Sequence, residues 1–270
     1  MKRKLILLAI AVKTILRYAI GMTHDGAAVQ IPGPQRVDRR ARRRRETIEE
    51  ILDIARDVMT EEGVNGLSLA EVARRLGVQP PSIYKYFPSL MAIYDALFLR
   101  GQVEHLEVMR QAMAGADPGF EALTAGLEAS GRWALANRAI AQLMFWRPVP
   151  SFEPSADAFS PSVEMVALQR AAMADAVAAG QLGPEADSEE AVYLVSTLIV
   201  GVLSQAMANE PDLEWGKGRF TATFPKLMKL LAAAYPVPSA ESNGGGALSD
   251  TEQRPQNAPP YAVRRSSTKR

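Results

Sequence analysis

The sequence predicts an all-α fold, and three observations lead to that prediction. Apolar residues recur at steps of three and four along most of the chain, as they do on one face of a helix. Proline and glycine fall between these segments, where helices begin and end. No stretch of residues 89–235 alternates apolar and polar side chains as a half-buried strand does. With 270 residues, the chain is long enough for two modest domains with substantial cores.

The composition excludes several classes of protein. The chain has no cysteine, so it can hold no disulfide, thiolate metal site or cysteine nucleophile, and a reducing cytoplasm suits it. Its two histidines, His24 and His105, lack the spacing of paired metal ligands. There is also no glycine-rich phosphate loop and no Gly-x-Ser-x-Gly motif. We therefore expect neither an enzyme nor a bound metal or cofactor.

The N-terminal 44 residues read as a mostly disordered extension that ends in a basic arm. Residues 36–45 contain seven arginines and one acid, a run that attracts polyanions or merely keeps the chain soluble. Upstream, the apolar run from Leu5 to Val12 is too short to span a bilayer. We expect translation to start at Met22. The alternative is a membrane-surface anchor, which would make the protein a helical adaptor.

Residues 45–98 have the pattern of a three-helix domain. A first helix runs from Glu46 until Gly63 stops it, and Ser68-Leu69-Ala70-Glu71 is a capping box that starts a second helix near Leu69. Gly77 suits a left-handed C-cap. Pro80 and Pro81 then suit the first turn of a third helix, where amides have no helical acceptor. Helix, tight turn and helix make a helix-turn-helix.

The third helix has an inner and an outer side. Ile83 and Phe87 are four residues apart and should face the core. The polar residues that fall on the outer arc are Ser82, Tyr84, Lys85 and Tyr86. Hydroxyls, an ammonium group and aromatic rings at a helix start suit the phosphates and base edges of a DNA major groove. Alternatively, the two tyrosines could simply border the core.

This segment resembles the DNA-binding domain of the TetR family of bacterial transcriptional regulators. The resemblance rests on ILDIARDVMTEEGVNGLSLAEVARRLGVQPPSIYKYFPSLMAIYDAL taken as a whole. It implies that Ser68 touches phosphate and that Pro81, Ser82, Tyr84, Lys85 and Tyr86 lie against DNA. One departure is Leu90, which stands where the family usually has a phosphate-contacting lysine. The arginines that could supply that charge instead are Arg42, Arg43, Arg44 and Arg45.

Residues 99–235 read as a second, entirely helical domain for effector binding and dimerisation. The expected helices, starting inside the first domain, are 89–114, 118–136, 137–147, 160–182, 187–208 and 212–235. Residues 191–208 are apolar almost all round, which indicates a helix buried in a core or between subunits. Together, 187–208 and 212–235 could form a homodimer interface. A central helix within one subunit is the alternative.

Aromatic residues and methionines mark a candidate pocket for a small effector. They are Trp133, Met144, Phe145, Trp146 and Tyr193, although such residues also simply fill cores. We expect His105 to be a surface or core residue rather than a ligand contact. Residues 236–270 should be disordered. The resulting hypothesis is a cytoplasmic homodimer, with no membrane segment, that represses transcription at a palindromic double-stranded DNA operator until a small apolar effector binds.

Overall fold

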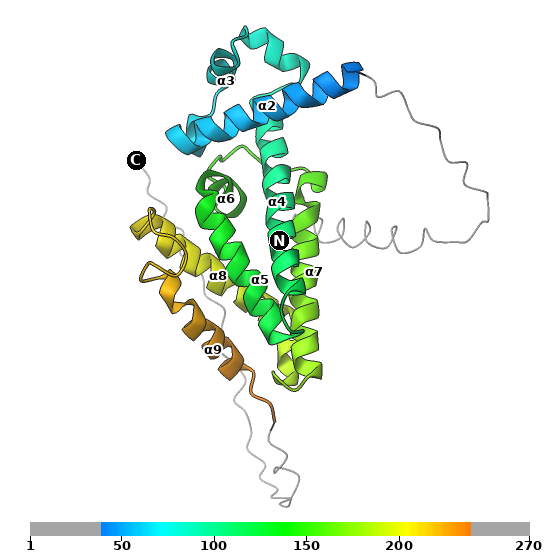
Figure 1. The fold of residues 1–270 in the computed structure, drawn as a ribbon, viewed down its shortest axis with the longest axis vertical. Helices are drawn as coiled ribbons and strands as arrows, with labels where there is room; N and C mark the ends of the chain where they lie inside the picture. Colours follow the sequence, from blue (N-terminus) through cyan, green and yellow to red (C-terminus); the bar gives the residue numbers. More distant parts are fainter. Residues whose placement is uncertain (1–38, 239–270) are drawn as a thin grey trace, which may run out of the picture. The chain divides into compact units, whose positions relative to one another are not determined.

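The computed structural model describes residues 39–238, and the prediction of an all-α fold is confirmed there (Figure 1). The chain divides between Glu50 and Ile51 into two units, each considered by itself. The elements are α2 (Arg39–Glu62), η1 (Val64–Gly66), α3 (Leu69–Leu76), η2 (Pro80–Lys85), α4 (Leu90–Ala114), α5 (Phe120–Ala136), α6 (Arg138–Phe145), α7 (Ala156–Ala178), η3 (Pro184–Ala186), α8 (Glu189–Asn209), η4 (Thr221–Thr223) and α9 (Phe224–Ala234). The predictions for Met22, the N-terminal anchor and the tail from residue 239 lie outside the described residues.

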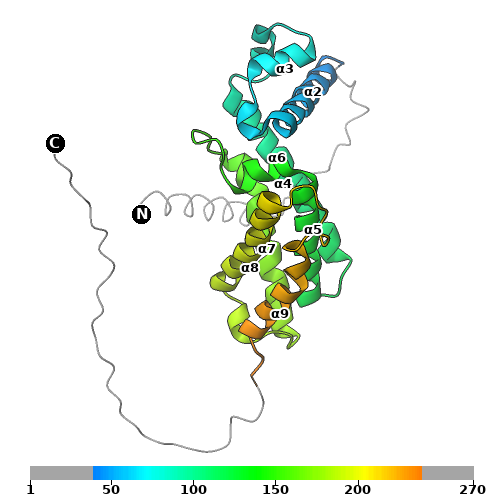
Figure 2. The same cartoon turned by 90° about the vertical axis from the view of Figure 1, so that its left-hand side faces the viewer.

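The long helix α4 is the central element from Ile51 onward. It packs against α5, α6 and α7, while α8 contacts α5 and α7 and α9 lies beside α8 (Figures 1 and 2). At its first turns, the Tyr94 hydroxyl donates a 2.6 Å hydrogen bond to the Val64 carbonyl. The Asp95 carboxylate accepts bonds of 2.7 and 2.8 Å from the backbone N–H and hydroxyl of Ser155. These bonds tie η1 and the start of α7 to the same helix.

Gly101 allows α4 and α6 to approach closely. A Cβ atom at this position would lie 2.3 Å from Ile140 Cγ2 and 2.8 Å from Met144 Sδ. Those separations are far below van der Waals contact, so a larger residue must push α6 away.

We therefore expect Gly101→Ala to lower the free energy of unfolding by about 1–3 kcal/mol, measured by urea denaturation. Ile140→Ala removes the obstructing methyl group. The double variant should be destabilised less than the sum of the single variants, because the closer of the two clashes is absent. Strict additivity would contradict this account of the contact.

The start of α7 differs from the sequence prediction for a local reason. Helix α7 begins at Ala156 rather than near 160, because the Ser155 hydroxyl accepts a 3.1 Å bond from the Ala158 N–H and caps it. Pro161 therefore lies inside the helix. It cannot bond the Asp157 carbonyl, and the Ser160 hydroxyl donates to that carbonyl at 2.8 Å instead.

The prediction of one helix over 212–235 is wrong, since α9 begins only at Phe224. Trp215 buries itself in the preceding loop, 5.3 Å from the Phe224 ring and against Gly131 of α5. The burial of this large side chain stabilises a loop in place of about three helical turns. Residues 39–44, at the end of the extension predicted to be mostly disordered, are helical.

Candidate nucleic-acid interface

Helix α3 begins and ends as the sequence predicts. The Ser68 hydroxyl accepts a 3.2 Å bond from the Glu71 N–H, and Gly77 adopts a left-handed φ of 72° at the C-cap. Of the two hydrogen bonds expected in the capping box, only this one is found among the described residues. The Glu71 carboxylate turns to Arg74 and Arg75 rather than back to the Ser68 amide. The Ser68 hydroxyl can still donate its own hydrogen, as a phosphate contact requires.

The predicted third helix is a six-residue 3₁₀ helix, η2, rather than an α-helix. Gln79 is extended and Pro80 starts the turn, as the two prolines require. Ile83 is fully buried and its carbonyl accepts bonds from the N–H groups of Tyr86 and Phe87. The Tyr86 bond spans three residues, as in a 3₁₀ turn, which rarely extends far, whereas the Phe87 bond spans four.

The predicted DNA contacts gather on the outer side of this motif. Tyr84 is 53% exposed, Lys85 and Pro81 are exposed, and Ser82 and Tyr86 are half-buried. Since α3 packs against η2, Ser68 belongs to the same small unit. The structure therefore brings together hydroxyl, ammonium and aromatic groups on a short rigid element, which is what major-groove recognition uses.

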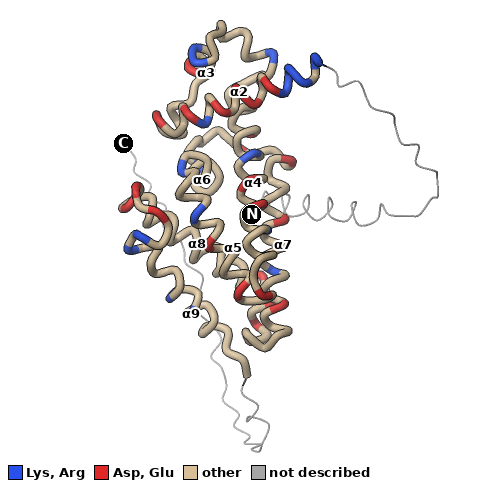
Figure 3. The backbone as a smooth tube through the Cα atoms, in the orientation of Figure 1, with Lys and Arg blue, Asp and Glu red and all other residues tan. Residues whose placement is uncertain are grey.

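The arginine arm belongs to the other unit. The four arginines from residue 42 to residue 45 are exposed in the first turns of α2, where Figure 3 shows a concentration of basic residues. Arg42 forms a 3.3 Å ion pair with Glu46. An exposed pair of this kind is weak, so it leaves the arm strongly basic.

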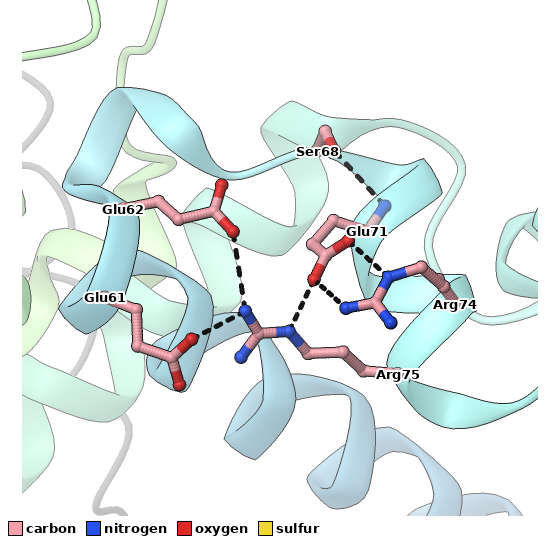
Figure 4. A network of polar contacts seen from close by, with 6 residues as sticks. All are labelled: Glu61, Glu62, Ser68, Glu71, Arg74 and Arg75. Atoms are coloured by element: carbon pink, nitrogen blue, oxygen red, sulfur yellow. Dashed lines mark hydrogen bonds and ion pairs between the residues drawn. The ribbon is translucent and has the colours of Figure 1, made fainter.

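An ion-pair network that the sequence analysis did not identify joins α3 to the end of α2 (Figure 4). The Arg75 guanidinium lies 2.7 Å from both Glu61 and Glu71 and 3.4 Å from Glu62, while Arg74 lies 2.6 Å from Glu71. Hydrogen bonds from Arg74 and then Arg75 lower the pKa of Glu71 to about 2. The adjacent acidic and basic pairs were visible in the sequence, but their meeting depends on the turn between the helices.

Arg75→Lys tests this bridge, because a lysine cannot contact several carboxylates with a planar fork. We expect the pKa of Glu71 to rise from about 2 towards 4.5, and α3 amides to exchange hydrogen faster. Because the folded-state pKa is lowered, the stabilisation is complete above pH 4.5 and is lost as the pH falls towards 2. Carbon-detected NMR titration measures the first effect.

Arg74→Lys is the matched control, since Arg74 contacts only Glu71 within this network. It should also raise the pKa of Glu71 but leave the exchange rates of α3 unchanged. Equal exchange in the two variants would show that Arg75 does not hold the helices together.

Comparisons with known proteins agree with this geometry. The family model described as bacterial regulatory proteins, tetR family, matches residues 51–97. This part of the chain is therefore similar to the TetR family. Residues 51–97 contain α3, η2 and the buried part of α2, so the matched region is the helix-turn-helix described above.

One curated relative and two solved structures are also similar to this chain. The uncharacterized HTH-type transcriptional regulator YobS of Bacillus subtilis (strain 168) is 36% identical over 63 residues, 23% of this chain and 33% of its own. This chain thus spans a third of that relative's length. The crystal structure of putative regulatory protein SCO4313 has a TM-score of 0.58 at 25% identity, covering 72% of this chain and 98% of that one.

The similarity to the second solved structure concerns the fold alone. The transcriptional regulator FadR from Bacillus subtilis, solved in complex with stearoyl-CoA, has a TM-score of 0.55 at 16% identity. The match covers 68% of this chain and 97% of that chain. The two solved structures therefore share the fold of most of this chain.

The predicted pocket residues separate into two groups. Trp133 and Met144 are buried and Phe145 and Trp146 are half-buried, and the Trp146 indole N–H donates a 2.9 Å bond to Ser204 on α8. Tyr193 is 65% exposed, so within one subunit it does not join this buried set. Its exposure instead places it on the outer face of α8.

His105 is a buried residue at the centre of the first group. Its ring stacks on Trp133 at 4.8 Å, meets Phe145 edge-on at 5.7 Å, and its Nε2 lies 2.6 Å from the Ser130 hydroxyl. Burial lowers the pKa of His105 to about 4, so the ring is neutral near pH 7. The sequence pointed to Trp133 and Phe145 but not to their contacts with His105, because these residues come from three helices.

Helices α8 and α9 carry few charged residues along their lengths (Figure 3). Tyr193 and Gly201 are exposed on α8, and Leu230 is 64% exposed on α9. Among the described helices, only α8 is long and apolar enough to cross a membrane by length and composition, and 39% of its apolar window is buried. This helix already packs on α5, α7 and α9, so a further protein surface would suit its exposed side.

Proposed function

We propose that this protein is a homodimeric transcriptional repressor that reads a palindromic operator and releases it when a small molecule binds the helical domain. The observation that carries the proposal is the capped α3 followed by η2, with Tyr84 and Lys85 exposed on its outer side. Phosphate contacts from Ser68 and the arginine arm would position this element, and the side chains of η2 would read bases.

Dimerisation through α8 and α9 is part of the proposal. Exposed Tyr193, Gly201 and Leu230 supply an apolar surface on two neighbouring helices, and Gly201 has no atom near its Cβ direction within 4 Å. A twofold axis there would present two reading elements, as a palindrome of half-sites about 34–36 Å apart requires.

Effector binding is supported by the buried aromatic group around His105 and by the fold shared with FadR. The assignment of repression rather than activation follows the habit of the TetR family. We place the protein in the cytoplasm, where its DNA would be. TetR-family regulators are generally not enzymes, and residues 39–238 contain no group of three potential metal ligands.

Selection of bound duplexes from a randomised DNA library, followed by sequencing, tests the proposal. Enrichment of one palindrome is the expected result. Tyr84→Ala should then relax sequence preference, whereas deleting residues 1–43 should weaken binding to all sequences and flatten its salt dependence by about 0.9 per lost phosphate contact. An unenriched pool would show that η2 does not read bases, and cell fractionation to the membrane would favour the adaptor alternative.

A further inference from the structure

Four buried polar atoms without a hydrogen-bond partner lie on facing helices of the effector-binding domain. They are Gln102 Oε1 and His105 Nδ1 on α4, and Ser162 Oγ and Gln169 Oε1 on α7. The side chains of Gln102, His105 and Gln169 are only 4%, 5% and 8% exposed. Buried polar groups in folded proteins almost always have partners, so this concentration calls for a specific explanation.

Helical spacing and side-chain contacts place these groups along one internal line between α4, α5 and α7, here called the seam. Gln102, His105, Leu106 and Met109 lie at steps of three and four on α4, and Leu106 and Met109 form a core cluster with Met165 of α7. Ser162 and Gln169 flank Met165 at steps of three and four. Ser130 of α5 closes the seam through its bond to His105.

The chemistry of the seam defines what it can bind. Two amide groups, a hydroxyl and an imidazole carry no net charge, and the low pKa of His105 keeps the ring neutral. A glutamine amide has an acceptor oxygen and a donor NH₂ group, and in both glutamines the buried atom without a partner is the oxygen. Oxygens require donors, so a complementary molecule carries at least two O–H or N–H groups.

Aromatic and methionine side chains make up the rest of the seam. Trp133, stacked on His105, and Phe145, at its edge, are flat surfaces that suit an aromatic ring. Met109 and Met165, with the partly buried Met113, are flexible side chains that can repack around a guest.

We propose that this seam between α4, α5 and α7 is the polar recognition site for the effector, and that the effector is a neutral, hydroxylated aromatic molecule. This differs from the apolar effector that the sequence suggested, and it rests on the proposed effector-responsive function. The two glutamines and His105 would determine specificity, because a molecule that lacks donors leaves them without partners.

Thermal unfolding and calorimetric titration of the full chain test the site without DNA. Hydroquinone, kept reduced, is the donor-bearing probe, and p-xylene is the isosteric control without donors. Hydroquinone should raise Tm and bind with a Kd at least about tenfold lower than that of p-xylene, and it should change Trp133 fluorescence. Equal binding of both probes, or binding of neither, would overturn the proposal.

The variants Gln102→Met and Gln169→Met separate a recognition role from a structural one. Each replaces a partnerless buried amide with an unbranched apolar side chain of similar length, so Tm without probe should rise. Hydroquinone binding should weaken by about tenfold or more in both. A fall in Tm with unchanged binding would show that the amides are satisfied within the fold, for example by buried water. Gln111→Met, on the exposed end of α4, is the control and should change neither quantity.

Because these readouts involve no operator, they fail independently of the DNA-binding proposal. If hydroquinone binds but the library selection finds no palindrome, the proposed effector site stands and the proposed regulatory function is wrong. If a palindrome is found and hydroquinone does not bind, only the effector class is wrong.

Discussion

Replacing Leu230 with aspartate should abolish dimerisation and, with it, tight operator binding. Leu230 is 64% exposed on α9, so the subunit itself should lose no more than about 0.5 kcal/mol of unfolding free energy. In the proposed interface, by contrast, an unpaired carboxylate would be buried, which costs several kcal/mol. We expect the dimer Kd to rise by at least about 100-fold and operator affinity to fall with it, because one subunit contacts one half-site.

Analytical ultracentrifugation and operator binding at fixed salt measure the two effects. Lys229→Asp is the matched control, since it places the same carboxylate on the adjacent exposed position of α9, turned away from Leu230 around the helix. The control should remain dimeric. A Leu230→Asp dimer that still binds the operator tightly would exclude α9 from the interface.

Acidification should destabilise the protein through His105. Its folded-state pKa is about 4, against an ordinary value of 6.5, because burial disfavours the charged ring. The unfolded chain therefore gains a proton between pH 6.5 and 4 that the folded chain does not, and stability falls as the pH falls through this window. The shift corresponds to about 3 kcal/mol.

His105→Gln removes this titration while keeping a neutral side chain that can bond the Ser130 hydroxyl. Urea unfolding of both proteins at pH 7 and pH 4 isolates the contribution, since carboxylates act equally in each. The loss on acidification should be smaller by about 3 kcal/mol in the variant. Identical losses would show that His105 is not neutral and buried in solution.

The sequence by itself determined the all-α fold and the ends of its short motifs. Ser68 caps α3 and Gly77 ends it because both effects act within one helical turn. Pro80 and Pro81 place the start of η2 for the same reason, since proline restricts its own backbone and that of the residue before it. The inner and outer sides of η2 followed from the four-residue step between Ile83 and Phe87.

Only the tertiary structure decided the features that depend on residues distant in the sequence. The Arg75 network forms because a turn returns α3 to the end of α2, and α9 begins at Phe224 because Trp215 is buried against α5. In the sequence, nothing distinguishes His105 from other residues of a helix. Its surroundings are Ser130, Trp133 and Phe145, which lie on other helices. Local rules govern where helices start and stop, whereas burial, and with it the pKa and pairing of each polar group, depends on which helices meet.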